Sequence, residues 1–165
     1  MFFFKITLMR HGEAVGSPDI RRQLTADGRA QTGRVAKTMA DLGILPDFVL
    51  CSGVDRTRQT LDSMNITSVP VFYCDEDLYR AGSAREILDI IATHTPAYAR
   101  HPLIIGHNPT IHETARYLAR ESDIALSRPI QSSYTPSTAC VFECGIANWD
   151  MLHPSTSQLI HIISA

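Results

Sequence analysis

Short apolar runs alternate with segments of helical pattern along most of this chain, and this alternation restricts the fold more than any other feature. Four runs have the length of strands: 2–8, 46–51, 69–74 and 102–106. Helical patterns follow at 25–42, after Ser52, after Ser83 and from His107 to about Arg120. Alternating strands and helices imply parallel strands joined by right-handed crossovers, with helices on both faces. We therefore expect a three-layer α/β/α fold with a mostly parallel sheet.

Capping residues mark where these helices begin. Thr25 can cap the first helix, and Gly43 is a natural stop for it. Ser83-Ala84-Arg85-Glu86 has the pattern of a capping box. Asn108 and Pro109 supply a capping side chain and a first-turn proline for the helix that follows.

The remaining segments are less regular. Residues 14–24 form a polar loop, and residues 122–138 are polar and irregular. Three apolar runs follow at 139–142, 149–152 and 158–163 without helices between them. We expect them to extend the sheet, with an antiparallel member. No repeat or biased segment suggests a second domain, so residues 1–165 form a single domain.

Composition excludes several classes of partner. Fifteen Lys+Arg against 17 Asp+Glu give a net charge of −2, so no global field attracts nucleic acid or an anionic membrane. The apolar start is short and has neither a basic leader nor a small-residue cleavage site, which favours a first strand over a targeting segment. The cysteines form no CxxC pair or dense scaffold, which favours reduced thiols and a cytoplasmic location. They are Cys51, Cys74, Cys140 and Cys144.

Two arginines and two histidines fall at the carboxyl ends of predicted strands or in the turns beyond. Arg10 and His11 follow the first strand, Arg56 the second and His107 the fourth. Such ends meet at one crevice of an α/β sheet. The forked guanidinium suits phosphate oxygens, and an imidazole that is partly unprotonated near neutral pH is a competent nucleophile. These four residues predict a phosphoryl site that needs no metal or other cofactor.

Four ordered motifs carry a resemblance to the histidine phosphatase superfamily, also called phosphoglycerate mutase-like, and most closely to its small bacterial phosphohistidine phosphatases of the SixA type. The motifs are Arg10-His11-Gly12-Glu13, Leu24-Thr25-Ala26-Asp27-Gly28, Ser52-Gly53-Val54-Asp55-Arg56-Thr57-Arg58-Gln59-Thr60 and Ile105-Gly106-His107-Asn108-Pro109. The resemblance implies that His11 is the nucleophile and forms a covalent phosphohistidine intermediate. It also implies that Arg10 and Arg56 clamp the phosphate while His107 binds and stabilises the transferring group. Gly12 and Asn108 join the expected substrate-binding set, and Glu13 either orients His11 or lies at the rim.

The sequence departs from the wider superfamily in two places. Gly53 stands where many relatives carry proline, so the backbone there is expected to differ. No carboxylate falls clearly after the third strand, where phosphomonoesterases and mutases of the superfamily supply a glutamate acid. Glu76 and Asp77 are the candidate acids, although an acidic cluster at a strand exit also suits a solvated turn.

The missing acid also bears on the substrate. An alkoxide leaving group needs a positioned acid, whereas the imidazole of a phosphoramidate, protonated on its ring, departs neutral. We therefore expect a metal-independent protein phosphohistidine phosphatase in signal transduction. Its partner is a phosphorylated protein, for example a histidine-phosphotransfer domain. The alternatives are a phosphomonoesterase acting on a small phosphate ester and a low-turnover phosphoprotein-binding regulator. The oligomeric state stays open, and a monomer is compatible with the sequence.

No long insertion suggests a lid over the crevice, and residues 131–138 either line its mouth or form a plain connection. Rival chemistries lack a required residue. A cysteine phosphatase built on Cys51 needs an arginine where Thr57 stands, and a magnesium-dependent reading of Asp75-Glu76-Asp77 meets Tyr79 instead of Thr or Val. A zinc helix at His112-Glu113 has Arg116 in place of its second histidine. We expect Arg58 to be a solvated helix residue.

Overall fold

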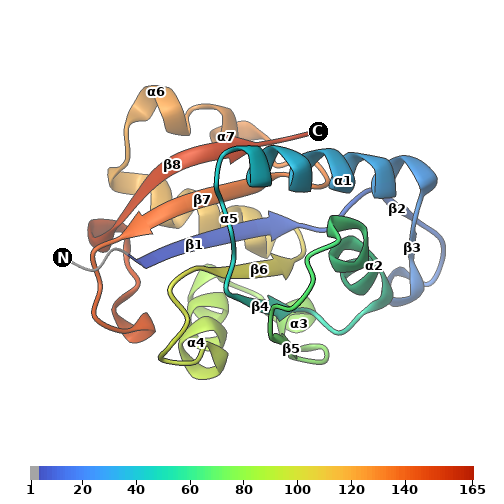
Figure 1. Cartoon of the computed structure of the whole chain (residues 1–165), viewed down its shortest axis with the longest axis horizontal. Helices are drawn as coiled ribbons and strands as arrows, with labels where there is room; N and C mark the ends of the chain where they lie inside the picture. The colour runs from blue at the N-terminus through green and yellow to red at the C-terminus, as the bar shows by residue number, and fades with distance from the viewer. Residues whose placement is uncertain (1–3) are drawn as a thin grey trace.

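The computed structural model describes residues 4–165, and the expected first strand is confirmed from Phe4; Phe2 and Phe3 lie outside the described residues. A six-stranded sheet of order β5-β4-β6-β1-β7-β8 forms the centre of the molecule (Figure 1). Its strands are β1 (Phe4–Arg10), β4 (Phe48–Cys51), β5 (Val71–Tyr73), β6 (Pro102–Gly106), β7 (Ala139–Cys144) and β8 (Ser157–Ile163). The pairs β1/β6, β4/β6 and β4/β5 are parallel, whereas β7 is antiparallel to β1 and to β8. The mostly parallel sheet with an antiparallel member is as predicted.

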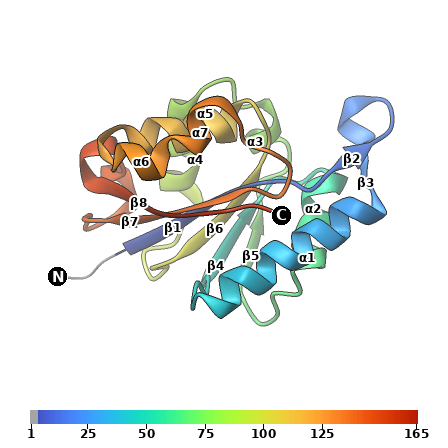
Figure 2. The ribbon, with the colours of Figure 1, turned by 90° about the horizontal axis from the view of Figure 1, so that it is seen from above.

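Helices cover both faces of this sheet. Figure 2 shows α1 (Ala26–Asp41) and α2 (Asp55–Met64) on one face, with α4 (Ala84–His94) and α5 (Thr110–Leu118) on the other. Side chains of one strand alternate between two cores, since Leu8 packs on the α4/α5 side and its neighbour Met9 on the α1/α2 side. Burial on both faces explains why β4 and β6 are continuous apolar runs instead of alternating ones. The three-layer α/β/α architecture is confirmed.

Two of the three predicted helix starts are confirmed. Thr25 Oγ1 accepts a hydrogen bond from the Gly28 amide at 2.8 Å, and Ser83 Oγ accepts one from the Glu86 amide at 3.3 Å. The prediction that Asn108 caps α5 is wrong. The N-cap residue is Pro109, and the Asn108 amide turns away to donate to the Tyr134 carbonyl at 3.1 Å.

Three segments contain structure that the sequence pattern did not predict. The polar loop 14–24 is a small hairpin, and two short helices occupy the stretch expected to be irregular. The run 149–152 is a 3-10 helix instead of a strand, because Trp149 is buried edge-on against Phe4 and Asn148 caps the turn through the Asp150 amide. The elements are β2 (Ala14–Val15), η1 (Asp19–Arg21), β3 (Gln23–Leu24), α3 (Asp77–Arg80), η2 (Ala119–Glu121), α6 (Ile124–Ser127), α7 (Pro129–Ser132), η3 (Trp149–Met151) and η4 (Pro154–Thr156).

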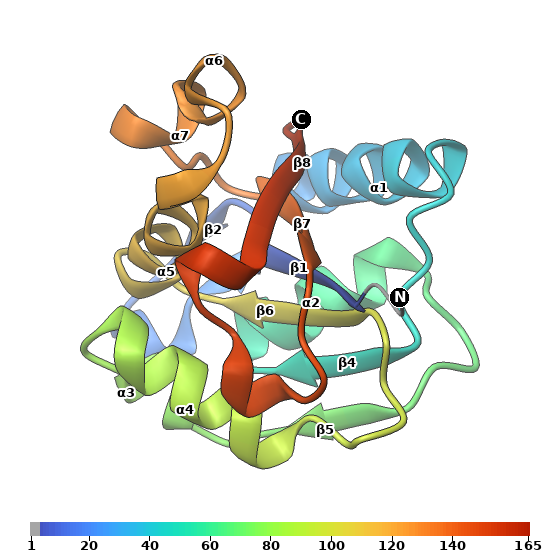
Figure 3. The same cartoon turned by 90° about the vertical axis from the view of Figure 1, so that its left-hand side faces the viewer.

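The last two strands, β7 and β8, lie at one edge of the sheet. Figure 3 shows β7 and β8 at this side, with α1 on one face and α5, α6 and α7 on the other. Among residues 4–165, no helix combines the length and the apolar character that a membrane span requires.

Candidate active site

The three central strands bring the predicted residues together. β4, β6 and β1 are consecutive in the sheet, and Arg56, His107 and His11 follow their carboxyl ends. The His11 amide donates to the Gly106 carbonyl at 3.1 Å, which ties the end of β1 to the end of β6. The rings of His11 and His107 lie 5.3 Å apart between centroids. The predicted convergence of these residues at the carboxyl ends of neighbouring strands therefore exists in the structure.

His11 is held as a neutral imidazole with one unprotonated nitrogen. Its Nδ1 lies 2.6 Å from the Gly12 carbonyl oxygen, which can only accept, so Nδ1 carries the ring proton. Its Nε2 then keeps the lone pair and accepts from Arg56 Nε at 3.2 Å. Burial lowers the pKa of His11 to about 4, against the opposing hydrogen bond to Gly12, and the arginine charges add to the lowering. Nε2 is the atom suited to attack a phosphorus centre.

His107 lies beside His11, at the end of β6. Its Nε2 lies 2.8 Å from Ser52 Oγ, and its Nδ1 is buried without a hydrogen-bond partner. Burial lowers the pKa of His107 to about 2, and the positive charges of the site lower it further. A bound dianion would oppose this lowering, because a nearby negative charge favours the protonated imidazole.

Arg10 and Arg56 are fixed in place by the protein. Arg10 Nη1 donates to the Tyr134 carbonyl at 2.9 Å, and its Nε is buried without a partner. Burial, together with the charges of Arg22 and Arg56, lowers the pKa of Arg10. Arg56, whose side chain is only 4% exposed, donates from Nη1 to the Asp19 carbonyl at 2.7 Å. Two desolvated cations side by side favour an anionic ligand between them.

Unsatisfied polar atoms also gather here. Within residues 4–165, four buried side-chain nitrogen or oxygen atoms lack a partner, and three belong to the predicted site: Arg10 Nε, His107 Nδ1 and Asn108 Oδ1. Each such atom costs roughly 1–3 kcal/mol when left unpaired. A ligand with several oxygens would satisfy the two nitrogens, so the cluster indicates a binding site for a phosphoryl group.

Gly12, expected in the substrate-binding set, and Glu13, expected either to orient His11 or to lie at the rim, both have hydrogen-bond partners within the protein. The Gly12 amide donates to Thr60 Oγ1 at 2.9 Å and its carbonyl accepts from His11, so Gly12 orients the histidine and has no free backbone donor for a substrate. A Cβ at this position would lie 2.8 Å from Thr32 Oγ1, which explains the glycine. Glu13 Oε1 accepts from Thr25 Oγ1 at 2.7 Å and lies at the rim, not on His11.

Neither candidate acid contacts the four core residues of the site. Glu76 accepts from Arg80 Nε at 2.7 Å, and Asp77 is an exposed residue in the first turn of α3. Both line an open groove of about 760 Å³ beside Gly53, at the rim of the site. Their place fits the solvated turn better than that of an acid directed at the nucleophile.

Gly53 departs from the usual proline for a physical reason. Its amide donates to the Asp75 carbonyl at 2.5 Å, a bond that proline cannot form. A Cβ at this position would lie 2.7 Å from the same oxygen. The expected difference in the backbone is therefore a close approach between the turn after β4 and the turn after β5.

Sequence reasoning missed two residues that complete the rim of the site. Asp19 Oδ2 lies 3.1 Å from Arg56 Nη2 and accepts from the Tyr79 hydroxyl at 2.9 Å. The Tyr79 ring packs edge-on against His107, with centroids 5.3 Å apart. Neither residue belongs to a long periodic segment, so no pattern in the sequence places them. Thr60 could have been found, since it lies four residues after Arg56 on the same helix face.

The described residues also bear on the requirements of metal and thiolate chemistry. Among residues 4–165, no group of three or more His, Cys, Asp or Glu side chains is arranged to hold a metal ion. The four cysteines are buried and unpaired, and burial raises the pKa of Cys51 to about 12, which leaves no thiolate for a cysteine phosphatase. The outer residue Arg58 is exposed and stacks over Tyr73 at 4.0 Å, as expected of a helix surface.

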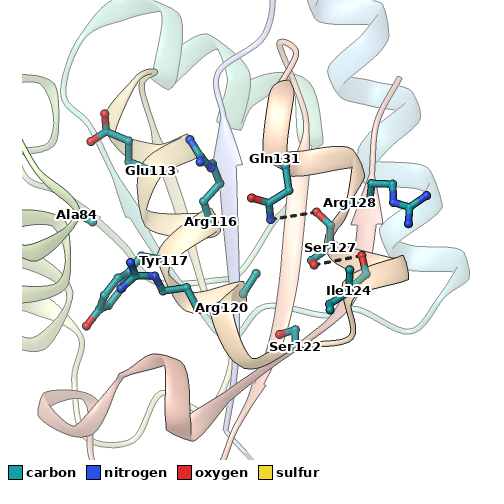
Figure 4. Close-up of a pocket in the computed structure, with 11 residues that line it drawn as sticks. Ala84, Glu113, Arg116, Tyr117, Arg120, Ser122, Ile124, Ser127, Arg128 and Gln131 are labelled. Atoms are coloured by element: carbon teal, nitrogen blue, oxygen red, sulfur yellow. Dashed lines mark hydrogen bonds between the residues drawn. The ribbon is translucent and has the colours of Figure 1, made fainter.

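A second arginine-rich region lies elsewhere. A groove of about 580 Å³ runs over α5, α6 and α7, and none of the predicted site residues lines it (Figure 4). Arg116 belongs to α5, Arg120 to η2, and Arg128 to the junction of α6 and α7.

Known proteins are similar to this chain in fold and in sequence. The family model described as the histidine phosphatase superfamily, branch 1, matches residues 6–78. A structure from Nakamurella multipartitia, provisionally described as the phosphohistidine phosphatase SixA, is 30% identical with a TM-score of 0.84 over 97% of this chain and 95% of that one. A counterpart from Agrobacterium tumefaciens, described in the same way, is 25% identical with a TM-score of 0.78 over 98% and 99%.

A curated relative, an uncharacterised chloroplastic protein of Arabidopsis thaliana, is 28% identical over 132 residues. That match covers 72% of this chain and 60% of the plant protein, so the chain spans less than two thirds of that relative. The chain belongs to the histidine phosphatase superfamily, branch 1.

Proposed function

We propose that this protein hydrolyses phosphohistidine on a partner protein through a phosphorylated His11. The observation that carries the proposal is a neutral His11, whose unprotonated Nε2 is held by a hydrogen bond from the buried Arg56, with no carboxylate in contact with either site histidine within residues 4–165. The similarity to proteins described as phosphohistidine phosphatases supports the same substrate class.

In the first step His11 Nε2 attacks the phosphorus of the substrate. A new N–P bond forms as the bond between phosphorus and the substrate imidazole breaks. That imidazole departs neutral if its other nitrogen already carries a proton, so no protein acid is required. Arg10, Arg56 and His107 hold the phosphoryl oxygens and stabilise charge as it develops.

In the second step water attacks phosphorus and the bond to His11 Nε2 breaks. The proton lost by water passes to solvent or to the departing phosphate, and inorganic phosphate is released. While phosphorylated, the ring of His11 carries a proton on Nδ1 and is positively charged. The Gly12 carbonyl, 2.6 Å from Nδ1, stabilises that charge and keeps the ring oriented for both steps.

The comparison of three substrates tests this function. A phosphohistidine-bearing protein should be hydrolysed with the highest kcat/KM, aryl phosphates should be intermediate, and sugar phosphates or phosphoserine peptides should be slowest. This order follows from the protonation that each leaving group needs. A sugar phosphate that outruns the phosphohistidine protein would establish a metabolite phosphatase instead. Tight binding of the phosphoprotein without phosphate release would establish a regulator.

A further inference from the structure

Asp19 lies against the outer end of the phosphate clamp. The Arg56 guanidinium donates from Nε to His11 and from Nη2 to the Asp19 carboxylate at 3.1 Å. The Tyr79 hydroxyl donates to the same carboxylate oxygen at 2.9 Å. Within residues 4–165, Asp19 is the only carboxylate that forms an ion pair with a member of the predicted site.

Differences in exposure show which end of the phosphate clamp faces solvent. The side chains of His11, His107 and Arg56 are buried, whereas the Asp19 side chain is 55% exposed. In an in-line displacement the leaving group points away from the attacking His11, which here means toward solvent. Asp19 and Tyr79 are the rim residues that contact Arg56, so a leaving group that points outward from the clamp would lie near them.

The leaving group of a phosphohistidine has a feature that esters lack. Its imidazole departs as a neutral ring only when the nitrogen that does not bear phosphorus is protonated, which gives the substrate a positively charged N–H donor at the rim. A carboxylate beside this N–H raises the ring pKa and accepts a charge-assisted hydrogen bond. Aryl and alkyl phosphates present no such donor.

We propose that Asp19 is a specificity-determining residue that accepts the N–H of the protonated phosphohistidine ring, with Tyr79 holding the carboxylate in place. The inference rests on the proposed function and names the group that selects phosphoramidates. In this step the bond between His11 Nε2 and phosphorus forms, and the bond between phosphorus and the nitrogen of the substrate ring breaks. The other ring nitrogen keeps its proton, and this N–H donates a hydrogen bond to Asp19. Asp19 neither gives nor takes a proton.

The surrounding charges keep Asp19 ionised for this task. Arg22 faces it from its own segment with Nη1 3.4 Å from Oδ1, Arg56 faces it from α2, and the Tyr79 hydroxyl faces it from α3. The Tyr79 hydrogen bond, with the charge of Arg56, lowers the pKa of Asp19, while the pKa of Tyr79 is raised by the same bond. An ionised carboxylate suits the role of a hydrogen-bond acceptor.

Asp19→Asn tests the inference, with Asp55→Asn as the matched control. Asp55 is an exposed carboxylate of the neighbouring rim that accepts from Gln23 Nε2, and within residues 4–165 its side chain forms no hydrogen bond or ion pair with Arg10 or Arg56. The probes are a chemically phosphorylated histidine peptide and p-nitrophenyl phosphate. Asp19→Asn should lower kcat/KM for the peptide by roughly 10- to 100-fold, because it removes a charge-assisted contact, and change the aryl ester by less than about threefold. Asp55→Asn should leave both unchanged.

The pH dependence of kcat adds a measurement that a purely structural role would not move. With the phosphohistidine peptide, the alkaline limb should shift to lower pH by about one pH unit in Asp19→Asn, because the carboxylate no longer favours the protonated ring. With the aryl ester the limb should not move. Tyr79→Phe keeps the aromatic ring against His107 but removes the hydroxyl that holds Asp19. It should lower kcat/KM for the phosphohistidine peptide selectively, by less than Asp19→Asn does.

Two outcomes would overturn the inference in distinguishable ways. An equal loss on both substrates, with no shift of the alkaline limb, would show that Asp19 only positions Arg56, and the proposed function would stand. A wild-type protein that hydrolyses the aryl ester but not the phosphohistidine peptide would overturn the proposed function and this inference together.

Discussion

Two regions of this molecule collect arginines, and they differ in how those arginines are held. At the carboxyl ends of the central strands, Arg10 donates to a backbone carbonyl, and Arg56 donates to a backbone carbonyl and to His11. The Nε atom of Arg10 is buried without a hydrogen-bond partner. In the groove over α5, α6 and α7, the arginines at 116, 120 and 128 are exposed, and none has a carboxylate partner within residues 4–165. Figure 4 shows that their side chains point in different directions.

A cluster of cations is therefore not enough to identify a phosphate site, because the way in which the cations are held also matters. An exposed arginine interacts weakly with anions, because water screens its charge and ordering its long side chain costs entropy. A buried arginine has already lost that freedom when the protein folds, and its charge acts through a poorly screened environment. The site at the carboxyl ends of β1, β4 and β6 should therefore bind and transfer a phosphoryl group, while the groove over α5, α6 and α7 should do neither.

Alanine substitutions should separate the two regions by the largest margin. Arg10→Ala, Arg56→Ala and His107→Ala should each lower kcat/KM for p-nitrophenyl phosphate by roughly 10²–10³, since each removes a donor directed at the transferring group. Arg116→Ala and Arg120→Ala should change it by less than about twofold. Comparable losses in both regions would remove the distinction drawn between them.

Binding of inorganic phosphate should reveal the same contrast without catalysis. At a hundredfold excess over Kd, a ligand stabilises the folded state by about 2.7 kcal/mol, which raises Tm by roughly 5–10 °C for a domain of this size. Thermal unfolding should show this rise in the wild type and in Arg116→Ala, and its loss in Arg10→Ala. A rise that survives in Arg10→Ala but disappears in Arg116→Ala would place the anion in the groove.

Acidification should affect the site little over a wide range. Because the pKa of His11 is lowered to about 4, the nucleophile stays neutral from pH 7 to pH 5 and loses reactivity only as pH falls toward 4. After correction for ionisation of the substrate, kcat/KM should change by less than about twofold between pH 7 and pH 5. An ordinary histidine with a pKa of about 6.5 would lose roughly 30-fold at pH 5. Such a loss would show that His11 is not desolvated.

Removal of metal ions should have the smallest effect. The buried arginines neutralise the phosphate without help, so activity should persist at full rate after prolonged chelation. An absolute requirement for magnesium would instead direct attention to the acidic turn at Asp75, Glu76 and Asp77.

Much of the fold was predictable because it depends on local pattern. Strands buried on both faces give unbroken apolar runs, and helices such as α1 begin at a residue like Thr25 that caps them through a hydrogen bond three residues away. The short elements were not predictable, because tertiary contacts determine them. Trp149, for example, lies in an apolar run that looks like a strand, yet its packing against Phe4 and its bond to the Ala99 carbonyl produce a helical turn.

The site divides in the same way. Arg10, His11, Arg56 and His107 could be found because chain order alone places the ends of parallel strands at one edge. Asp19 and Tyr79 could not, since they come from a hairpin and a four-residue helix whose positions over Arg56 depend on contacts between distant segments. Gly12 was given a substrate contact because sequence proximity does not reveal that Thr60 and His11 already occupy its backbone groups.

Rapid-quench labelling shows whether His11 is transiently phosphorylated during turnover. Wild-type protein mixed with a ³²P-labelled phosphohistidine substrate and stopped within milliseconds should carry an acid-labile, base-stable phosphoryl group that maps to His11. His11→Ala should form none and should lose turnover, although it still binds phosphate. A variant that lacks this imidazole and yet turns over substrate at the wild-type rate would contradict the account.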